Sequence, residues 1–397
     1  MLTLERIKDA QRVLSKDVRK TDLFLASNIL SKNNIYLKTE NLQVTGSFKA
    51  RGAAYKISQL SPEEKAKGII ACSAGNHAQG VARAAQKNNI PCTICMPDGA
   101  PLSKIAATKN YGADICLVKG TYDDAYNKAL ELLEERKATF VHPFNDLDVM
   151  AGQGTIGLEI LEQLPEVDAV VAAIGGGGLL SGLAVAIKTL KPECKVYGVQ
   201  AENAPSMFNS FKTKQIVKMD SADTFADGIA VKVPGDLTYK HIEKYVDDIF
   251  LVTEDEIAAA ILTLLEKQKV VSEGAGAVPV AACCFDKLPL VGKNVACIVS
   301  GGNIDVNILN RVITRGLIMD GRRATFTIAT ADKPGQLNKI CDCIGRCGGN
   351  ILEVYHSSSD PTMPINSCFV RVLTETRDAN HSNEIRASLI AAGLALI

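Results

Sequence analysis

The sequence predicts an α/β protein built on parallel sheet structure, followed by a smaller unit of a different plan. From about residue 35 to residue 315, short apolar runs alternate with segments of helical periodicity, and this alternation is typical of a parallel sheet covered by helices. After about Asp320 the expected order becomes strand, helix, strand, strand, helix, strand, which is the ferredoxin-like plan. A chain of 397 residues is also too long for one ordinary core. We therefore expect two domains, residues 1–320 and residues 321–397.

The first domain should open with an amphipathic helix within residues 1–20 and a second helix over residues 48–60. Continuous apolar runs then predict buried strands, at residues 69–72, 92–96, 115–118, 169–174, 196–200 and 295–300. Helical segments separate most of these strands, for example at residues 78–87, 122–137 and 179–190. The first three strand–helix units fall between residue 49 and about residue 150, and we expect them to form a smaller lobe inserted in a larger one.

Helices and strands are predicted over almost the whole length of the second domain. Strands are expected at residues 324–330, 350–357, 365–376 and 394–397, and helices at residues 336–347 and 382–392. The basic, glycine-containing segment 315–323 in front of them reads as a hinge.

The composition excludes several functional classes. Lysine plus arginine equals aspartate plus glutamate, so the net charge is zero and no basic footprint for nucleic acid is present. The N-terminal segment mixes acids with bases and lacks the apolar core of a signal peptide. Residues 169–187 are uncharged and apolar, but four consecutive glycines in their middle argue against a membrane-spanning helix. We expect a cytoplasmic protein with no nucleic-acid and no membrane partner.

The chain has 12 cysteines, but their positions favour neither disulfides nor a metal site. Cys92 and Cys95 lie three apart on an expected strand, so their side chains face opposite ways. Cys341, Cys343 and Cys347 occur not far from His356 in the sequence, but Cys341 and Cys347 follow the apolar core face of an expected helix. We therefore expect reduced thiols and no bound metal.

Lys49 is the candidate catalytic residue, because it stands among small and apolar neighbours in the sequence VTGSFKARGA, residues 44–53. Desolvation lowers the pKa of a lysine amine and favours its neutral, nucleophilic form. Neutral lysine forms Schiff bases with aldehydes, including the aldehyde of pyridoxal phosphate. The alternative is an ordinary lysine that opens a helix, so the assignment depends on what the rest of the chain supplies.

The four glycines Gly175 to Gly178 follow an expected strand and precede an expected helix. Successive glycines let several N–H groups converge on one anion, and the helix N-terminus adds its partial positive charge. Neither the Walker A pattern nor the G-x-G-x-x-G spacing is present. The stretch therefore predicts a phosphate site, and the alternative is a tight packing turn between strand and helix.

Residues 73–77, with the sequence SAGNH, form a second expected turn from strand to helix. Backbone N–H groups there, together with the hydroxyl of Ser73, are suited to a carboxylate. Asn76 is suited to donate an amide hydrogen to a phenolic oxygen, whereas His77 alone is more typical of a helix cap. The candidate substrate-binding residues are Ser73, Ala74, Gly75, Asn76 and His77.

Ser300 ends the last expected strand of the first domain, where the carboxyl ends of parallel strands meet. A neutral hydroxyl that faces a pyridine nitrogen leaves this nitrogen unprotonated, which suits rapid β-elimination. Glu273 and Gly228 are expected in the same region.

Taken in order, the motifs TGSFK (residues 45–49), SAGNH (73–77), GGGG (175–178) and SGGN (300–303) resemble those of the fold-type II pyridoxal-phosphate enzymes. Among these enzymes the chain is most similar to the threonine dehydratases, or threonine ammonia-lyases, of the catabolic type, from about residue 7 to residue 315. The resemblance implies a two-lobed parallel-sheet catalytic domain with pyridoxal 5'-phosphate as cofactor. It implies conversion of L-threonine to 2-oxobutanoate and ammonia, with L-serine to pyruvate as a side reaction.

The resemblance also implies the roles of single residues. Lys49 would form the Schiff base and act as base at the substrate α-carbon. The four glycines would hold the cofactor phosphate, Asn76 the ring hydroxyl and Ser300 the ring nitrogen. The cofactor-binding residues expected in this way are Phe48, Lys49, Asn76, Gly175, Gly176, Gly177, Gly178, Leu179, Gly228, Glu273 and Ser300.

The C-terminal unit resembles an ACT domain, with DKPGQL (residues 332–337) and GNI (349–351) at the usual ligand-binding turns. Its last strand is short, because the chain given ends at Ile397. The resemblance implies a homo-oligomer, dimer or tetramer, and an effector, with isoleucine or valine first and a nucleotide such as AMP second. The regulatory residues expected are Gln336, Leu337, Asn350 and Ile351.

Two alternatives stay open at the level of the sequence. Serine racemases share the fold and most of the motifs, but they need a second base where this chain has Ala74, which cannot move a proton. Their divalent-cation site would fall on Gln200, Ala204 and Ser206, which carry too little charge for a tight site. A non-catalytic amino-acid sensor is the second alternative, and a complete set of motifs around Lys49 argues against it. The preference between threonine and serine, and a catabolic or an isoleucine-forming pathway, are left undecided.

Overall fold

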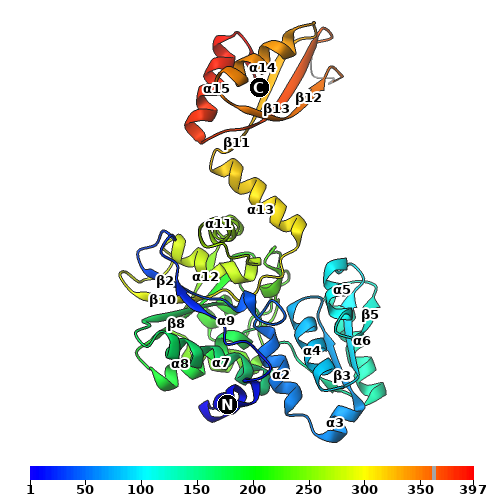
Figure 1. The fold of residues 1–397 in the computed structure, drawn as a ribbon. Coiled ribbons are helices and arrows are strands. Elements are labelled where there is room, and N and C mark those ends of the chain that lie inside the picture. Colours follow the sequence, from blue (N-terminus) through cyan, green and yellow to red (C-terminus); the bar gives the residue numbers. More distant parts are fainter. Residues whose placement is uncertain (360–363) are drawn as a thin grey trace. The chain divides into compact units, whose positions relative to one another are not determined.

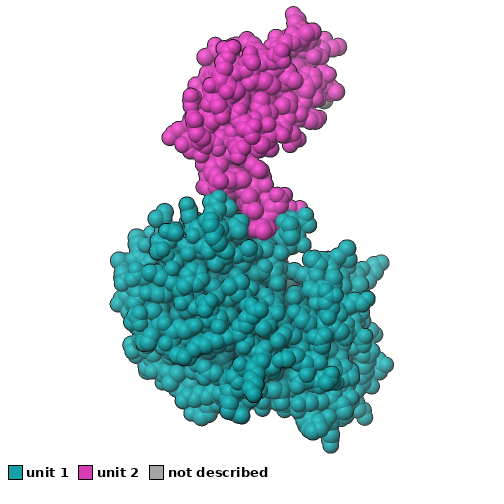
Figure 2. Space-filling model, in the orientation of Figure 1, with its two compact units in different colours: residues 1–308 teal, residues 309–397 magenta. Residues whose placement is uncertain are grey.

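The computed structural model describes residues 1–359 and 364–397. They form two compact units, residues 1–308 and residues 309–397 (Figure 2). The boundary between the units falls within helix α13 (Val306–Met319). The expected hinge over residues 315–323 is therefore wrong in its first part, because the helix continues to Met319. Its apolar residues keep helical spacing, and the single Gly316 does not interrupt it.

The larger sheet of the first unit has six strands, in the order β1-β2-β10-β7-β8-β9. Neighbouring strands are parallel except β1 and β2, which pair antiparallel. Helix α12 packs on one face of this sheet and α8 on the other (Figure 1). The strands are β1 (Leu23–Leu25), β2 (Asn34–Lys38), β7 (Ala169–Ala173), β8 (Lys195–Ala201), β9 (Asp248–Val252) and β10 (Asn294–Ile298).

The helices around the larger sheet are α1 (Leu4–Leu14), α7 (Leu147–Gln163), α8 (Gly178–Leu190), α9 (Ser206–Thr213), α10 (Asp236–Tyr245), α11 (Glu254–Thr263) and α12 (Gly274–Cys284). Three short helical segments complete this lobe: η1 (Glu40–Leu42), η2 (Asp227–Ile229) and η3 (Leu264–Gln268).

The smaller lobe is a four-stranded parallel sheet in the order β5-β4-β3-β6. Its strands are β3 (Ile69–Cys72), β4 (Cys92–Pro97), β5 (Asp114–Val118) and β6 (Thr139–Phe140). Its helices are α3 (Pro62–Lys67), α4 (Asn76–Lys87), α5 (Leu102–Lys109) and α6 (Tyr122–Arg136).

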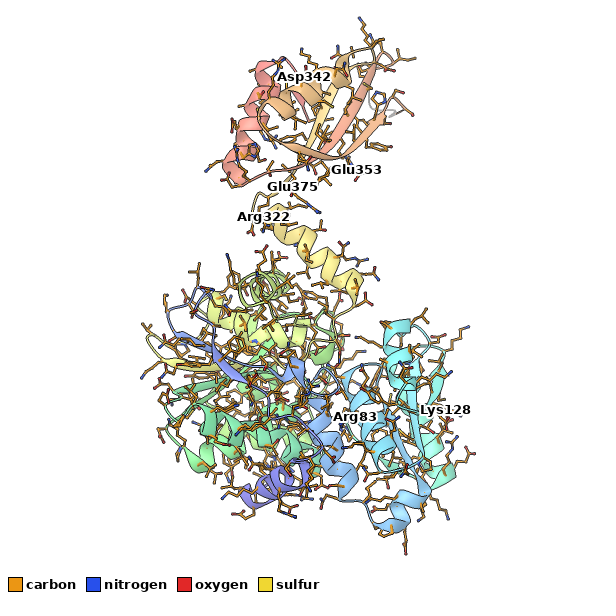
Figure 3. The ribbon with its side chains drawn as sticks, viewed as in Figure 1. Arg83, Lys128, Arg322, Asp342, Glu353 and Glu375 are labelled. Carbon is orange, nitrogen blue, oxygen red and sulfur yellow. The ribbon has the colours of Figure 1, made fainter. Side chains whose placement is uncertain are left out.

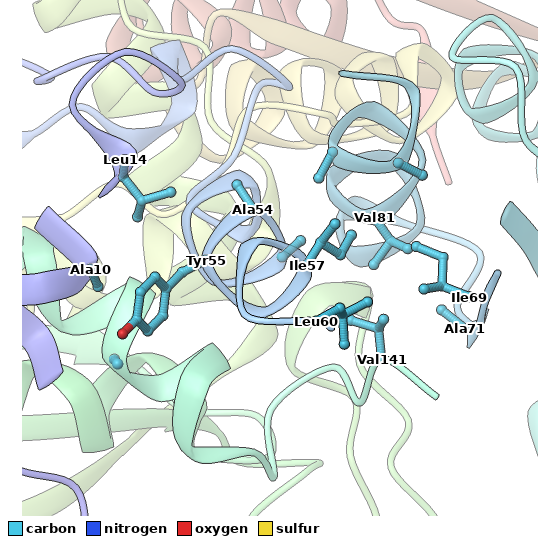
Figure 4. Packing of buried hydrophobic residues seen from close by; sticks show 14 of the residues in the cluster. Ala10, Leu14, Ala54, Tyr55, Ile57, Leu60, Ile69, Ala71, Val81 and Val141 are labelled. Atoms are coloured by element: carbon cyan, nitrogen blue, oxygen red, sulfur yellow. The ribbon is translucent and has the colours of Figure 1, made fainter. Parts of the chain in front are cut away.

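Helix α2 (Lys49–Ser58) joins the two lobes and packs against both α7 and α4. Its approach to α7 requires glycine, since a Cβ on Gly152 would lie 2.6 Å from the Cα of Gly52. A Cβ on Gly80 of α4 would similarly lie 3.0 Å from the carbonyl oxygen of Lys49. Figure 4 shows the apolar side of the same helix, where Tyr55 and Ile57 belong to a cluster shared with α1, β3 and α4. The first turn of α2 is thus held from several directions.

Four strands of the first unit were not expected from the sequence: β1, β2, β6 and β9. Strands β1 and β6 have only three and two residues, too few for a pattern. Strand β2 ends in Lys38, which is fully buried because it pairs with Glu159. Strand β9 begins with Asp248 and lies at the sheet edge. The charged residues at the end of β2 and the start of β9 interrupt the apolar pattern, so neither strand was recognised in the sequence.

The second unit has the ferredoxin-like order of elements and a four-stranded antiparallel sheet, β12-β13-β11-β14. One apolar core, which includes Phe326, Ile340 and Val370, joins the sheet to its two helices. After α13 its elements are β11 (Arg323–Ala331), α14 (Gln336–Arg346), β12 (Asn350–Ser357), β13 (Ser367–Glu375), α15 (Ala379–Ala391) and β14 (Ala395–Leu396).

The cysteines and the apolar runs agree with the sequence-based expectations in two respects. All twelve thiols lie in the described chain and are free. In the described residues, no helix has both the length and the apolar character needed to cross a membrane.

Candidate active site

Lys49 is positioned by the loop in front of it, which is held to the end of β10. The N–H of Phe48 donates to the carbonyl oxygen of Ser300 at 3.0 Å, and the N–H of Gly302 donates to that of Gly46 at 2.9 Å. Gly46 has a φ of +71°, and a Cβ there would meet Asn303 Oδ1 at 2.4 Å. The glycine of the TGSFK motif is therefore required both by its backbone conformation and by this close approach.

The Lys49 amine is the nucleophile that the site offers. Its Nζ donates to the carbonyl oxygen of Pro143 at 2.7 Å and lies 5.4 Å from the centre of the Phe48 ring. Burial lowers the pKa of Lys49 to about 8, and the charge of Glu273 counteracts part of this shift. A sizeable fraction of the amine is therefore neutral near pH 7 to 8, as nucleophilic attack and proton abstraction require.

A buried network of charges lies behind the catalytic turn. The guanidinium of Arg51 donates to both carboxylate oxygens of Glu40, at 2.8 and 2.7 Å, and to both of Glu159, at 2.6 and 2.9 Å. Lys38 Nζ donates to Glu159 at 2.6 Å. Burial alone would lower the pKa of Arg51, but Glu40 and Glu159 raise it above its ordinary value. The network fixes α2 two residues beyond Lys49.

Asn76, the first residue of α4, links three parts of the site. Its Nδ2 donates to Glu273 Oε1 at 2.7 Å, and its Oδ1 accepts from Asn303 Nδ2 at 2.8 Å. Asn303 Nδ2 also donates to the carbonyl oxygen of Thr45 at 2.8 Å. Burial raises the pKa of Glu273 to about 7, and the charge of Asp227 adds to the shift. Asn303 was part of a motif noted in the sequence, but its bridging position was not foreseen.

The four-glycine turn fits both interpretations made from the sequence, a tight packing turn and a phosphate site. A Cβ on Gly176 would lie 2.4 Å from the Phe144 ring, and one on Gly177, whose φ is +98°, would lie 2.9 Å from Thr238. Close packing therefore requires glycine. In the described chain, no backbone N–H from Gly175 to Gly177 donates to a backbone carbonyl, and the N–H groups of the first turn of α8 lack intrahelical partners. The turn thus also presents free donors suited to a phosphate, with Leu179 buried just behind it.

The SAGNH turn connects β3 to α4, and its Ala74 packs against the core. Ser73 Oγ accepts from the N–H of Gly75 at 3.2 Å, and Gly75 precedes the first residue of α4. His77 is buried and its Nε2 contacts the carbonyl oxygen of Val141 at 2.8 Å. Burial lowers the pKa of His77 to about 3, with the Lys49 charge adding to the effect. The imidazole is therefore neutral and structural, and only the backbone of His77 is suited to a substrate carboxylate.

Ser300 lies just beyond the carboxyl end of β10 and beside β7, whose end leads into the glycine turn. The residue is buried, with 2% of its surface exposed. Gly228 lies close by in η2, where a Cβ would be 3.4 Å from Glu273 Oε1. A hydroxyl at this edge of the sheet is suited to donate a hydrogen bond to a ring nitrogen.

The segment from His142 to Asn145 belongs to the site although no sequence pattern indicated it. It supplies the carbonyl oxygen of Pro143 that accepts from Lys49 and the Phe144 ring that packs on the glycine turn. His142 Nδ1 accepts from the N–H of Asn145 at 2.8 Å, and burial, with the Lys49 charge, lowers the pKa of His142 to about 4. This segment is irregular, so no sequence pattern indicates it, and its position in the site depends on contacts that form only when the chain folds.

These groups together fit pyridoxal phosphate: an amine of lowered pKa, free N–H donors at a helix N-terminus, and a hydroxyl beyond the end of β10. The fold and the site define a pyridoxal-phosphate enzyme of the α/β class. Residues 14–301 match the family model described as "Pyridoxal-phosphate dependent enzyme". The chain belongs to this family, and pyridoxal phosphate is its cofactor.

Individual proteins similar to this chain include enzymes that deaminate threonine and a serine racemase. The chain is 52% identical over 396 residues to the L-threonine ammonia-lyase of Thermotoga maritima, which covers 99% of this chain and 98% of the relative. The solved processed form of threonine deaminase isoform 2 from Solanum lycopersicum is 38% identical, with a TM-score of 0.74, over 78% of this chain and 87% of that one. The solved serine racemase of Dictyostelium discoideum is 37% identical, with a TM-score of 0.72, over 77% of this chain and 99% of that one.

Proposed function

We propose that this chain is a threonine ammonia-lyase, which eliminates water from L-threonine; the released enamine then reacts with water and yields 2-oxobutanoate and ammonia. L-Serine, which lacks only the methyl group, gives pyruvate as a side reaction. The observation that carries the proposal is the Lys49 amine, held at the start of α2 with a pKa of about 8 between a free-donor glycine turn and Asn76. The relative from Thermotoga maritima, similar over nearly the full chain, supports the choice of substrate.

Each of these residues would hold a different part of the cofactor. The N–H groups from Gly175 to Gly178 would hold the cofactor phosphate, Lys49 its aldehyde carbon, Asn76 the ring hydroxyl and Ser300 the ring nitrogen. When bound, pyridoxal phosphate withdraws electrons from the α-carbon of the amino acid. A hydroxyl at Ser300, in place of a carboxylate, would leave the ring nitrogen unprotonated and would make the cofactor a weaker electron sink.

Lys49 is the residue that would accept the α-proton of the substrate. Its depressed pKa leaves an unprotonated fraction at neutral pH that accepts the α-proton of the substrate. The backbone N–H groups of residues 73–77 at the start of α4 hold the substrate carboxylate. Glu273, with its pKa near 7, keeps the amide of Asn76 oriented by accepting its hydrogen bond.

The test of this assignment is Lys49→Ala, compared with Lys128→Ala on the outer helix α6 of the smaller lobe (Figure 3). Loss of the anchor and the base should reduce release of 2-oxobutanoate by more than about 100-fold. The control should keep its activity, and circular dichroism should show both variants folded. Near-normal turnover in folded Lys49→Ala would disprove the function.

Serine racemization is the second candidate, because the solved Dictyostelium enzyme is 37% identical. Ala74 leaves no side chain there that can move a proton from the second face of the substrate. Gln200 and Ser206, at the positions expected for a divalent cation, are engaged with protein backbone instead: Gln200 accepts from the N–H of Phe208 at 2.7 Å and Ser206 donates to the carbonyl oxygen of Val231 at 2.7 Å. Chiral chromatography of L-serine reactions separates the candidates, since the lyase should form keto acid and essentially no D-serine.

We further propose that the second unit is an ACT-type regulatory domain, spanning about residues 321–397, and that the enzyme is a homo-oligomer. Gln336 and Leu337 follow the end of β11 that pairs with Ser367, whereas Asn350 and Ile351 begin β12 opposite Glu375. Figure 3 labels Glu375 beside Arg322, whose carbonyl oxygen accepts from the N–H of Thr376 at 3.0 Å.

The two proposed effector turns therefore lie at opposite ends of the sheet within one chain. A second copy, with its sheet reversed against the first, would bring the Gln336 turn of one chain to the Asn350 turn of the other. This requirement supports an amino-acid effector, isoleucine or valine, bound between paired domains, and AMP is the second choice. A cytoplasmic location goes with the proposal, since all twelve thiols are free.

A further inference from the structure

A cluster of three chemically different side chains lies in the second unit and includes no residue of the candidate active site. Asp332, His356 and Cys368 place a carboxylate oxygen, an imidazole nitrogen and a thiol sulfur within 4.8 Å of one another. They come from three separate segments of the second unit, and Cys341, Cys343 and Cys347 do not belong to the cluster.

The register of the sheet explains why the three meet. Cys368 pairs with Thr330, and His356 pairs with Val370, across the neighbouring strands β11, β13 and β12. Side chains two residues apart on a strand share a face, so Cys368 lies on the face of Val370 and His356, and Asp332 continues the face of Thr330. The N–H of Asp332 donates to the carbonyl oxygen of Asn366 at 3.0 Å, which keeps this end of β11 beside β13. Three strands thus deliver three donors to one corner of the helix-covered face.

The donor set selects the kind of ion. A thiolate and an imidazole favour zinc and similar borderline cations, whereas magnesium and calcium prefer oxygen ligands. Metal–ligand bonds of about 2.0 to 2.3 Å place the donors of a tetrahedral site roughly 3.3 to 3.8 Å apart. Small rotations are enough to reach this spacing, since the side chains of Asp332 and His356 are about half exposed, while Cys368 is buried and held by its strand.

The competing explanation is a simple ion pair between His356 and Asp332. Their closest atoms, Nε2 and Oδ1, are 4.0 Å apart, which is beyond hydrogen-bond distance. An exposed pair of this kind contributes little to stability and does not require a cysteine at its side. The geometry leaves room for an atom between the two groups.

We propose that Asp332, His356 and Cys368 bind one divalent cation of the zinc class, with water in the fourth position. The proposed site shares no residue with the candidate active site, and it does not depend on the activity proposed above. Asp332 opens the turn that precedes α14, so the bound ion would fix this turn.

Cobalt is the probe, because a thiolate bound to Co²⁺ gives a charge-transfer absorbance in the near ultraviolet. The full-length holoenzyme, freed of metal by a chelator, is titrated with Co²⁺ and read as a difference spectrum against the same metal-free protein. We expect stoichiometric binding with the thiolate band, and displacement of the Co²⁺ by added Zn²⁺.

Variants locate the site. Cys368→Ser should abolish the thiolate band, and His356→Ala, at an exposed position, should weaken Co²⁺ binding by more than about tenfold without disturbing the core. Cys341→Ser, on α14 and outside the cluster, is the control and should bind like the wild type. The proposal is overturned if the wild type shows no thiolate band, if the band survives in Cys368→Ser, or if His356→Ala binds Co²⁺ with unchanged affinity.

Discussion

The side-chain amide of Asn76 donates to Glu273 Oε1 at 2.7 Å and so ties the first turn of α4 to the residue that precedes α12. Glu273 is almost completely buried, and its pKa is raised to about 7 from an ordinary 4.5. The carboxyl therefore keeps its proton in the folded protein at pH values where the unfolded chain has already lost it. The burial of Glu273, with the charge of Asp227, therefore makes the stability of the first unit depend on pH, whereas the hydrogen bond from Asn76 opposes the rise in pKa.

Glu273→Gln should remove that dependence. Because the folded pKa is the higher one, the contribution of Glu273 to stability falls as pH rises from about 4.5 to about 7 and is lowest above pH 7. The free energy of unfolding of the wild type relative to the variant should decrease by an amount on the order of 2 to 3 kcal/mol across this window. Urea unfolding at pH 5 and pH 8 measures the change, with the exposed Glu131→Gln as control. Parallel pH profiles for wild type and Glu273→Gln would contradict the raised pKa.

Arg51→Met should be strongly destabilising. The substitution removes the guanidinium that neutralises Glu40 and Glu159, and it leaves two carboxylates buried with only Lys38 between them. Removing one partner of a buried ion pair typically costs about 3 to 5 kcal/mol. Lys128→Met breaks the exposed pair with Glu131 and should leave the urea midpoint almost unchanged, since solvent screens an exposed pair. Urea midpoints of the two variants provide the comparison, and equal midpoints would show that the network contributes nothing.

Gly176→Ala should impair cofactor binding more than folding. The added methyl group would lie 2.4 Å from the Phe144 ring, so the turn must shift and its N–H donors lose their alignment. The strain should cost about 1 to 3 kcal/mol of stability, and saturation should require a much higher concentration of pyridoxal phosphate in a titration followed by visible absorbance. Gly345→Ala, on α14 with open space around the added Cβ, is the matched control and should be neutral or stabilising by up to about 1 kcal/mol. Unchanged cofactor affinity in Gly176→Ala would argue that the turn only packs.

Removal of the second unit should abolish regulation without abolishing catalysis. A chain that ends at Asp320 retains every residue of the active site, but it lacks the turns at Gln336 and Asn350. Full-length enzyme should respond to isoleucine or valine by a change of about 5- to 150-fold in affinity, which corresponds to couplings of about 1 to 3 kcal/mol. Steady-state kinetics with each amino acid, together with sedimentation of both proteins, measures response and assembly. If the shortened chain keeps both properties, the second unit is not the sensor.

Local features of the sequence determined much of the fold and the central chemistry. Apolar runs of four to six residues identified strands, and glycines marked the turns after β3, β7 and β10, because both signals depend only on neighbouring residues. The expectation that residues 115–118 form a buried strand was wrong in one respect, because β5 lies at the edge of its sheet and exposes Leu117. Lys49 could be singled out for the same reason, since its apolar neighbours are adjacent in the chain.

Only the tertiary structure decided which distant groups share an environment. Asn76 and Glu273 are 197 residues apart, Lys49 and Pro143 are 94 apart, and no periodicity connects them. From the sequence alone Lys38 would be expected to be exposed, but it is buried because Glu159 neutralises its charge. The charge of Lys38 also made strand β2 hard to recognise in the sequence. A charge becomes compatible with the interior only when folding supplies its partner, so burial, altered pKa values and the contacts of Asn303 and Phe144 follow from the packed chain and not from any one segment of it.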